Sequence, residues 1–436
     1  MRTSSLPVSI ATSCALVGGL FVASCDDHRI PAMLPSFSEA SNPAVLSTAP
    51  NGTVLYNGGF GSAIAQDHAD PTVFYLLTDR GPNAAGAAAN TIIFGKADFT
   101  PQIGRFHVVG NQLVLEKTIL LKNAAGQPLT GLPNPIGQGN TGEIALDLNG
   151  QTIAPNADGI DSEGLVLASD GTFWISDEYG PHIAHFDANG KTIERINPFG
   201  TGTGGRTLPK VLARRRPNRG MEGLTITPDG KTLVGLMQSP MYNPSSGAVS
   251  GSTVLRIITF DIATGATKQY VYLMENASLT GCSDIAAITN TTFLALERDG
   301  DYGGNPAKPA TFKRVYKFDI SNATDISDPT NGDGGKLYGG LTVEQLKDKA
   351  GLQTAGVVPV TKTLVFDLLT EISPVYPHDK AEGVYILSPT QLAISNDDDF
   401  GVVDNGQNGF TTKILPATGK VDVNRIYFVN LKAPLK

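Results

Sequence analysis

Short apolar runs alternate with glycine- and proline-containing turns along most of the chain, and few of these runs have the length of a helix. The clearest unit is residues 161–181, DSEGLVLASDGTFWISDEYGP, in which Leu165–Ala168 and Thr172–Ser176 flank a Ser-Asp-Gly turn. Short runs rich in β-branched and aromatic residues are typical of antiparallel strands joined by a tight turn. The pattern therefore predicts a hairpin whose two ends lie on one edge.

The same hairpin recurs along the chain, which indicates a fold built from internal repeats. Two further copies carry a Glu-Gly pair before the first strand, at residues 219–240 and 380–400. Two weaker copies occupy residues 282–300 and 61–83, and additional apolar runs follow each hairpin. Four antiparallel strands per repeat, arranged radially, predict an all-β protein of the β-propeller type.

The repeats indicate five blades, or six if residues 121–157 contain another one, because that connection is long for a compact domain. The last repeat lacks a fourth strand, and we expect Thr53–Asn57 to supply it and close the ring. The one helical stretch, Thr342–Ala350, is interpreted as a short insertion in the fourth repeat. Residues 44–436 are therefore predicted to form a single propeller domain.

The N-terminus has the features of an export signal, because Arg2 precedes the small and apolar run Ile10–Ala23. This run is too short and too rich in glycine and serine to span a membrane stably. It ends in VASC, which resembles the bacterial lipobox. We expect a signal peptide over residues 1–24 and a tether over residues 25–43.

Two alternatives remain for the cysteine of this motif. A lipid on Cys25 would make the protein a bacterial cell-envelope lipoprotein, whereas ordinary cleavage near Ser24 would make it a secreted soluble protein. If Cys14 leaves with the signal and Cys25 carries lipid, only Cys282 remains and no disulfide is needed. Without the lipid, Cys25 is free to pair with Cys282.

The overall charge limits the partners of the protein. A net charge of −8 over 436 residues argues against a nucleic-acid-binding protein. An anionic substrate would need local positive charge or a metal ion. We expect a small-molecule anionic ester as the ligand, contact with a membrane only through the N-terminal lipid, and a monomer.

Propeller geometry brings the carboxylates of all hairpins to one end of the central channel. The first strand of a blade lines the channel, and the second strand returns to the face where the first began. The acids assigned to the first strands are expected to form an inner ring that holds a metal ion: Glu163, Glu222, Asp284 and Glu382. The acids that follow the second strands are expected above this ring: Asp79, Asp177, Glu178, Glu297, Asp299 and Asp397–Asp399.

Carboxylates in this number cannot all be ionised at close range unless a cation is bound or some of them are protonated. Oxygen ligands in a flexible ring suit calcium or magnesium better than zinc, and we expect calcium. The alternative is that the acid-glycine pairs only cap turns and hold neighbouring blades together.

Basic residues reach the same end of the channel. Arg80 and Arg298 follow second strands, where a guanidinium can bind phosphate or carboxylate at two points, or can form an ion pair with a neighbouring acid. His182 and His378 lie near the mouth as possible proton carriers. A basic loop before the third repeat is expected either to guide anions or simply to be solvated: Arg206, Lys210, Arg214–Arg216 and Arg219.

These motifs resemble the phytase-like propeller family described as "esterase-like activity of phytase". The resemblance rests on TDRGPN, DSEGL with FWISDEYGPHIAHFDANGK, RGMEGLTITPDGKTL, LALERDG, AEGV and ISNDDDFG, in this order, over roughly residues 50–432. It implies hydrolysis of a phosphate ester or another ester, without a fixed substrate or catalytic residue. The third hairpin departs from the pattern, because it ends in Met237-Gln238 and carries no acid there.

The resemblance and the acidic mouth together favour an exported hydrolase that cleaves a phosphate ester with a calcium-like ion. Asp177, Glu178 or His182 would take the proton of the attacking water, and Arg80 and Arg298 would stabilise the developing charge. Substrate contacts are expected from Asp79, Glu297 and Asp398 as well. Two alternatives stay open: a lactonase-like or carboxylic-ester hydrolase, and a non-catalytic propeller that binds a ligand or a protein. No G-x-S-x-G nucleophile elbow occurs in the sequence.

Replacing Cys25 with Ser tests the lipobox. Because only the cysteine thiol can accept the lipid, the variant should accumulate as unprocessed precursor and lose labelling by a radioactive fatty acid in the producing bacterium. Normal processing of the variant would instead support plain secretion.

Overall fold

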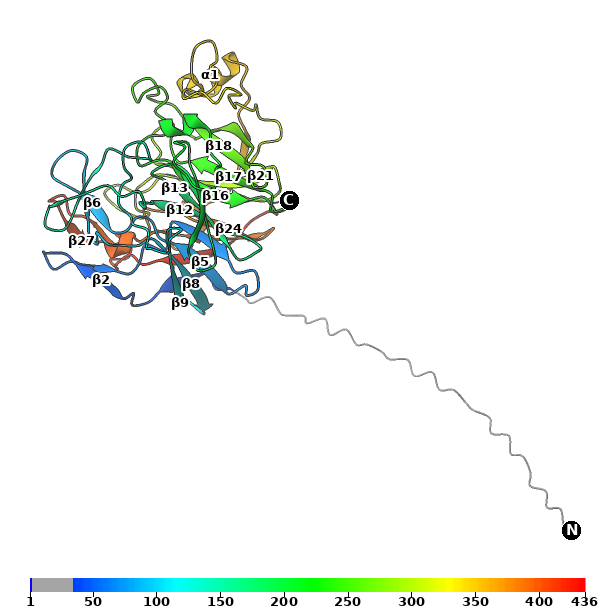
Figure 1. Cartoon of the computed structure of the whole chain (residues 1–436). Helices are drawn as coiled ribbons and strands as arrows, with labels where there is room; N and C mark the ends of the chain where they lie inside the picture. Colours follow the sequence, from blue (N-terminus) through cyan, green and yellow to red (C-terminus); the bar gives the residue numbers. More distant parts are fainter. Residues whose placement is uncertain (2–33, 436) are drawn as a thin grey trace. The chain divides into compact units, whose positions relative to one another are not determined.

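Five four-stranded antiparallel units, one for each predicted repeat, make up the body of the protein (Figure 1), and the first and last of them are joined by parallel pairing of one edge strand from each into a single eight-stranded sheet. The computed structural model describes Met1 and residues 34–435. Blade 1 consists of β4 (Ala63–Gln66), β5 (Val73–Leu77), β8 (Gln102–Val109) and β9 (Gln112–Leu120), and blade 2 consists of β12 (Ser162–Leu167), β13 (Phe173–Asp177), β14 (His182–Phe186) and β15 (Thr192–Ile196). Blade 3 consists of β16 (Met221–Ile226), β17 (Thr232–Met237), β18 (Val254–Asp261) and β19 (Thr267–Leu273), and blade 4 consists of β20 (Gly281–Ala287), β21 (Thr292–Arg298), β22 (Lys313–Asp319) and β23 (Thr361–Asp367). Blade 5 consists of β24 (Val384–Ser388), β25 (Gln391–Ser395), β28 (Arg425–Asn430) and β1 (Phe37–Ala40).

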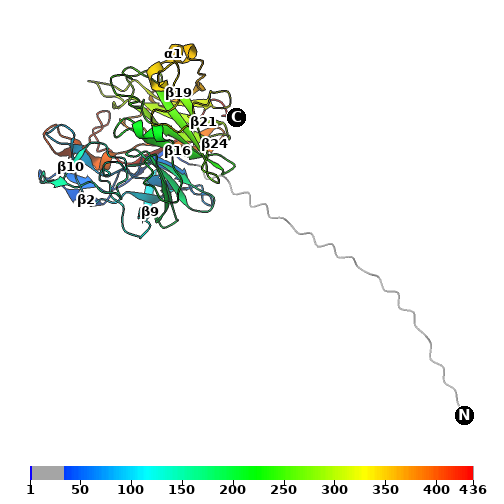
Figure 2. The same ribbon diagram turned by 45° about the horizontal axis from the view of Figure 1, so that its top comes forward.

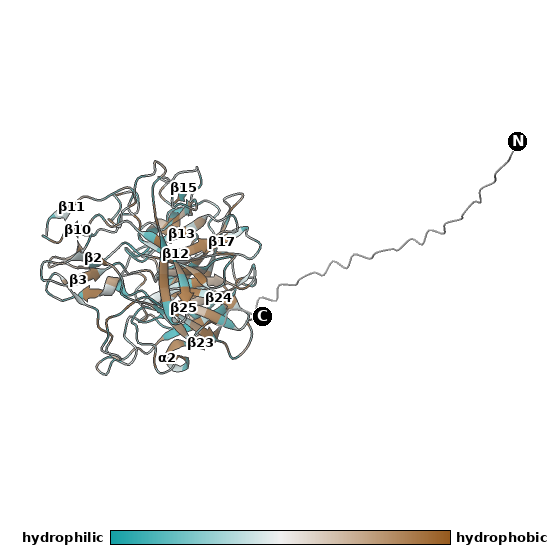
Figure 3. Ribbon diagram, turned by 90° about the horizontal axis from the view of Figure 1, so that it is seen from below, coloured by the Kyte–Doolittle hydropathy of each residue, from teal (hydrophilic) through white to brown (hydrophobic). Residues whose placement is uncertain are grey.

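The five blades close into a ring. Their first strands, β4, β12, β16, β20 and β24, contact one another in cyclic order, and β24 returns to β4. Five clusters of buried apolar side chains accompany this order, and each cluster joins two neighbouring blades. Figure 3 shows the apolar strands β12, β24 and β25 at the centre of the unit. The all-β propeller prediction is confirmed, with five blades in the described part of the chain.

The ring is closed by a different strand from the one predicted. The fourth strand of blade 5 is β1, which pairs antiparallel with β28, so that Phe37 lies opposite Tyr427. The predicted closing segment, Thr53–Asn57, instead contributes β3 (Val54–Tyr56), which pairs with β2 (Val45–Thr48). The prediction failed because both segments are short and β-prone, and the sequence does not show which of them reaches the open edge.

Residues 121–157 do not form a sixth blade. They supply β10 (Ile144–Leu146) and β11 (Thr152–Ile153), which extend a small sheet begun by β6 (Asn83–Ala85) and β7 (Thr91–Phe94). This sheet shares an apolar cluster with the β2–β3 hairpin and with β26 (Val402–Asp404) and β27 (Phe410–Thr412). The three small sheets lie together to one side of the blades (Figures 1 and 2).

Helical structure in the described residues is confined to short segments. The predicted insertion lies between β22 and β23 and contains a 3-10 turn at Val343–Leu346 and α1 (Lys349–Thr354), which packs beside β18 and β19. Arg256 of β18 and Glu344 of the insertion form a buried ion pair at 2.6 Å. The other helical segments are α2 (Leu368–Glu371) and 3-10 turns at Lys210–Arg214 and Asp399–Gly401. Within residues 34–435, no helix is long and apolar enough to cross a membrane.

The Glu-Gly pairs have a packing role that concerns the glycine. A Cβ atom on Gly164 would lie 2.5 Å from the backbone nitrogen of Leu224 in the next blade, and one on Gly223 would lie 2.8 Å from that of Ile285. A Cβ atom on Gly383 would lie 3.0 Å from the backbone nitrogen of Ile64. These contacts leave no room for a side chain, so the first strands of blades 2, 3 and 5 require glycine at this position.

Removing the closing strand should destabilise the propeller. A chain that begins at residue 42 lacks β1 and exposes the edges of β28 and β9 to water. We expect its melting temperature to be at least about 5 °C below that of a chain beginning at residue 34, measured by circular dichroism. Equal melting temperatures would contradict the role of β1 in closing the ring.

Candidate functional site

Equivalent positions in the five blades build two rings of side chains at one end of the channel. The strand registers place Ile64, Leu165, Leu224, Ile285 and Val384 at the same point of their strands. Two residues earlier, the first ring contains Ser62, Glu163, Glu222, Ser283 and Glu382. At or just after the ends of the second strands, the second ring contains Asp79, Glu178, Gln238, Arg298 and Asp397.

Both rings border a cavity of about 520 Å³, and all five members of the second ring line it. Its wall contains nine carboxylates and five cationic side chains. The carboxylates are Asp79, Asp161, Glu163, Glu178, Glu222, Asp379, Glu382, Asp397 and Asp399. The cations are Arg80, Arg216, Arg219, Arg298 and Lys380. The opposite end of the channel opens into a separate cavity with a mainly apolar lining, about 490 Å³ in volume.

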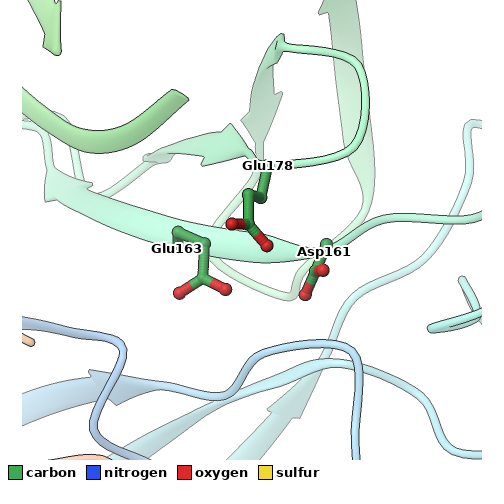
Figure 4. Close-up of side chains that lie close together, drawn as sticks. All are labelled: Asp161, Glu163 and Glu178. Carbon is green, nitrogen blue, oxygen red and sulfur yellow. The ribbon is translucent and has the colours of Figure 1, made fainter. Parts of the chain in front are cut away.

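Three carboxylates from blade 2 converge at the edge of the mouth cavity (Figure 4). Asp161 precedes β12, Glu163 lies within it and Glu178 follows β13. The backbone N–H of Glu178 donates to the carbonyl oxygen of Asp161 at 2.9 Å, which holds the two ends of the hairpin together. One oxygen of each of the three side chains lies within 4.8 Å of the other two. We call this group the triad; such spacing is suitable for a shared cation.

The triad is energetically unfavourable as a set of bare anions. Burial raises the pKa of each of the three carboxyls well above its usual range, and neighbouring negative charges add to that effect for Glu163 and Glu178. Burial also raises the pKa of Asp79 to about 7 and that of Glu222 to about 8, with Asp161 and Glu382 as the next causes. Protons or a cation must therefore neutralise this side of the cavity at neutral pH.

The opposite side of the cavity is already neutralised by ion pairs. Arg298 binds Glu382 and also donates to Ser283 Oγ at 2.8 Å. Lys380 contacts Asp397 at 2.8 Å and Asp399 at 2.5 Å. The uncompensated negative charge is therefore concentrated around blades 2 and 3.

The arginines of the cavity differ in whether they form ion pairs with carboxylates. Arg80 is held by Glu143 at 3.0 Å and faces Asp161 at 3.7 Å, so the ion-pair alternative applies to it as it does to Arg298. Arg219 donates to the carbonyl oxygen of Thr280 at 2.6 Å, and neither Arg216 nor Arg219 forms an ion pair with a carboxylate in the described chain. These two arginines are the cavity's available anion-binding groups.

The basic loop reaches the cavity only through Arg216 and Arg219. Arg206 pairs with Glu194, and Arg215 is buried, where it donates to the carbonyl oxygen of Tyr179 at 2.6 Å. Lys210 and Arg214 line a separate shallow pocket next to Phe199.

Asp284 lies elsewhere than the sequence suggested. The register puts Ser283 in the first ring and Asp284 at the position that glycine occupies in blades 2, 3 and 5. Its carboxylate accepts the backbone N–H of Val384 at 2.8 Å, and the residue lines the apolar cavity at the far end. In blade 4 the acid therefore has the alternative role, which is to hold neighbouring blades together: Asp284 links β20 to β24.

Asp177 and His182 were expected to act at the mouth, but they lie behind its wall. Asp177 accepts the backbone N–H groups of Asp161 at 2.9 Å and Tyr179 at 3.0 Å, and it lies 3.1 Å from His182. Burial and the charge of Arg195 hold the pKa of His182 well below its usual range. Neither residue lines the cavity, because successive residues of a strand point to opposite faces.

Glu297 and Asp398 also point away from the cavity. Glu297 accepts the Tyr272 hydroxyl at 2.5 Å and the backbone N–H of Glu275 at 3.0 Å, between blades 3 and 4. Asp398 accepts the backbone N–H of Gly59 at 2.6 Å.

Two more expected mouth residues occupy similar buried places. Asp299 binds Lys313 at 3.0 Å, and His378 lies between Asp422 and Tyr427. None of these residues borders the mouth cavity.

Sequence reasoning missed Asp161, Asp379 and Lys380 as site residues. Asp161 precedes the first-ring acid of blade 2 by two residues, and Lys380 takes the same place in blade 5. The equivalent positions in the other blades are Phe60, Gly220 and Gly281, so no repeated charge marks this position in the sequence.

Comparisons with known proteins add the family. The family model described as "Phytase-like: Esterase-like activity of phytase" matches residues 56–400, most of the chain. An uncharacterized secreted protein of Arthroderma benhamiae is 28% identical over 307 residues, which cover 56% of this chain and 60% of that protein. The chain therefore spans about 60% of the length of this curated relative.

Solved structures show only a distant likeness. A luciferin-regenerating enzyme has a TM-score of 0.35 at 9% identity, and a putative oxidoreductase (glucose dehydrogenase) from Thermus thermophilus has a TM-score of 0.34 at 12% identity. Each match covers 90% of this chain and 99% of the other. Scores at this level add no argument about fold or chemistry.

Replacing Asp398 with Asn tests its assignment as a buried structural acid. Burial raises its pKa to about 8, so the stability that comes from its protonated form is present below about pH 4 and is lost as the pH rises towards 8. Asparagine keeps an acceptor for Gly59. The variant should therefore melt at least about 3 °C above the wild type at pH 8.5 in chelator, and much closer to it at pH 5. The exposed Asp404→Asn variant is the control, and a melting-temperature difference independent of pH would contradict the assignment.

Proposed function

Because the chain belongs to the phytase-like family, we propose that it is a hydrolase that cleaves a phosphate ester in the mouth cavity with the help of a divalent cation. The family description supports a hydrolase of the esterase type in general. The phosphate ester as substrate is our own step, and the geometry of the cavity is the reason for it.

The observation that carries this proposal is the presence of two complementary kinds of group in one cavity. The triad offers three close carboxylates for a cation. Arg219, which lies near Glu178, and Arg216 offer guanidinium groups without carboxylate partners in the described chain. A phosphate monoester has oxygens for both: some can approach a cation held by the triad, and others can accept hydrogen bonds from the arginines. An uncharged lactone or carboxylic ester would leave the arginines unused.

The residues of the triad fit a hard divalent cation. All three ligands are carboxylates, and their pKa values are raised, chiefly by burial and then by neighbouring negative charges, so a bound cation would stabilise their ionised forms. Calcium accepts six to eight oxygen ligands in flexible geometry, so protein carboxylates, water and substrate oxygens can share it. When bound, the ion would neutralise the triad and polarise the phosphoryl group.

Each remaining role falls to a residue that lines the cavity. Arg219 and Arg216 would bind the phosphoryl oxygens and stabilise the charge that develops on them. Asp79, with a pKa of about 7, would accept the proton of the attacking water, since a general base works best near the pH of operation. Arg80 and Arg298 would position the neighbouring acids from their ion pairs, in place of the catalytic roles expected from the sequence.

We also propose that the protein is exported and acts as a monomer on a small anionic ester. The N-terminal sequence and the printed description of the Arthroderma relative as secreted support export. The lipobox and Cys25 lie outside the described residues, so the lipid anchor stays a prediction.

A panel of substrates tests the activity. Phosphomonoesters, phytate, carboxylic esters and lactones should be offered to purified protein with calcium and with chelator. We expect turnover of a phosphate ester that chelator abolishes and calcium restores. Metal-independent hydrolysis, or preference for lactones, would contradict the proposal. Calcium binding without activity on any substrate would favour a binding propeller.

Replacing Arg219 with Ala should lower kcat/KM for a phosphate ester by roughly ten- to a thousandfold, because a donor to the transition-state charge is lost. Arg214→Ala is a matched control from the same loop, where the side chain is exposed and outside the mouth cavity. Equal effects of the two substitutions would exclude Arg219 from the reaction.

A further inference from the structure

Two neighbouring residues that line the mouth cavity each carry an oxygen atom with no hydrogen-bond partner among the described residues and no ion pair. The atoms are Glu222 Oε2 and Gln238 Oε1, on residues that are 2% and 6% exposed. The two side chains are joined by a hydrogen bond of 2.6 Å from Gln238 Nε2 to Glu222 Oε1. Each therefore keeps one buried acceptor oxygen without a donor, which is costly.

No cationic side chain satisfies these oxygens. Arg298 is held by Glu382 and Ser283, and Arg219 donates to Thr280 and, at 3.5 Å, to Ser239. No ion pair of Glu222 is found within the described chain. These two oxygens are therefore suitable ligands for a cation, which accepts electron pairs from oxygen.

Glu222 also stands next to the triad. Among neighbouring charges, that of Glu222 contributes most to the raised pKa of both Glu163 and Glu178. Ser176 joins the two blades here, because its hydroxyl donates to the carbonyl oxygen of Glu222 at 3.0 Å. Burial and the charge of Glu382 raise the pKa of Glu222 to about 8 although Arg298 and Arg219 act to lower it, and Glu222 Oε2 has no hydrogen-bond donor.

We propose a second divalent cation site beside the triad, formed by Glu222 Oε2 and Gln238 Oε1 and bordered by Glu163 and Glu178. This inference rests on the proposed function, because the second ion adjoins the first. A carboxylate together with an amide carbonyl oxygen is a ligand combination typical of calcium. It also gives the third hairpin a role: its Gln238, in place of the usual acid, contributes a neutral oxygen to a site that is already strongly negative.

Calcium binding counts the sites directly. Metal-free protein, prepared with a chelator that is then removed, should bind two calcium ions per chain in isothermal titration calorimetry with calcium chloride alone. Gln238→Leu and Glu222→Gln should each weaken binding of the second ion at least about tenfold while the first ion still binds. Two substitutions of different chemistry guard against a folding defect, and melting temperatures verify the folded state.

The control variant is Asp284→Asn, which changes a channel-wall carboxyl outside the mouth cavity but keeps an acceptor for Val384. It should still bind two ions, whereas Glu163→Gln should weaken both. Wild-type protein that binds one ion, lost in Glu163→Gln but kept in Glu222→Gln, would overturn the second site and leave the proposed function standing. Absence of calcium binding in the wild type would overturn both proposals. Two ions retained in both Gln238→Leu and Glu222→Gln would place the second ion elsewhere.

Discussion

The close approach of the five first strands around the channel is the constraint on which the site depends. At Gly164 and Gly223 the next strand leaves no space for a Cβ atom. The strand register shifts at the same place, between Ser162 and Leu165 in blade 2 and between Met221 and Gly223 in blade 3. A bulge of this kind reorients the residue beside it, and the side chains of Glu163 and Glu222 thus reach the cavity instead of the blade interior.

Because every blade repeats this arrangement, charged side chains gather at one end of the channel. The differences in sequence between the blades decide the net charge of each side of the cavity. Blades 4 and 5 supply Arg298 and Lys380, which neutralise their carboxylates within the wall. Blade 2 supplies carboxylates alone, and blade 3 supplies Glu222 with the neutral Gln238. The fivefold ring therefore has one negative side and one neutral side, and this asymmetry places the candidate cation sites off the channel axis, in a cavity that Arg216 and Arg219 also line.

The sequence was sufficient for the fold class because the short apolar runs between turns and the repeated hairpin both report on local structure. It also identified Glu163, Glu178, Glu222 and Glu382 at the mouth, since a returning hairpin brings its ends together. It could not decide which of two adjacent acids faces the cavity: Glu178 does and Asp177 does not.

Longer-range features were beyond the same reasoning. Asp284 was misplaced because a one-residue offset in register is invisible without the pairing of the strands. The closing strand β1 and the partners of Arg80 depend on contacts between segments far apart in the chain, for which the local pattern carries no signal.

The central claim is that the buried carboxylates of blade 2 are neutralised by a divalent cation rather than by protons. A crystal structure of the protein grown with calcium, with anomalous differences collected at long wavelength, tests it most directly. We predict an anomalous peak at the triad, within ligand distance of oxygens from Asp161, Glu163 and Glu178. The same crystal with no peak at the triad, and with the three carboxyl groups hydrogen-bonded to one another or to Arg219, would contradict the account.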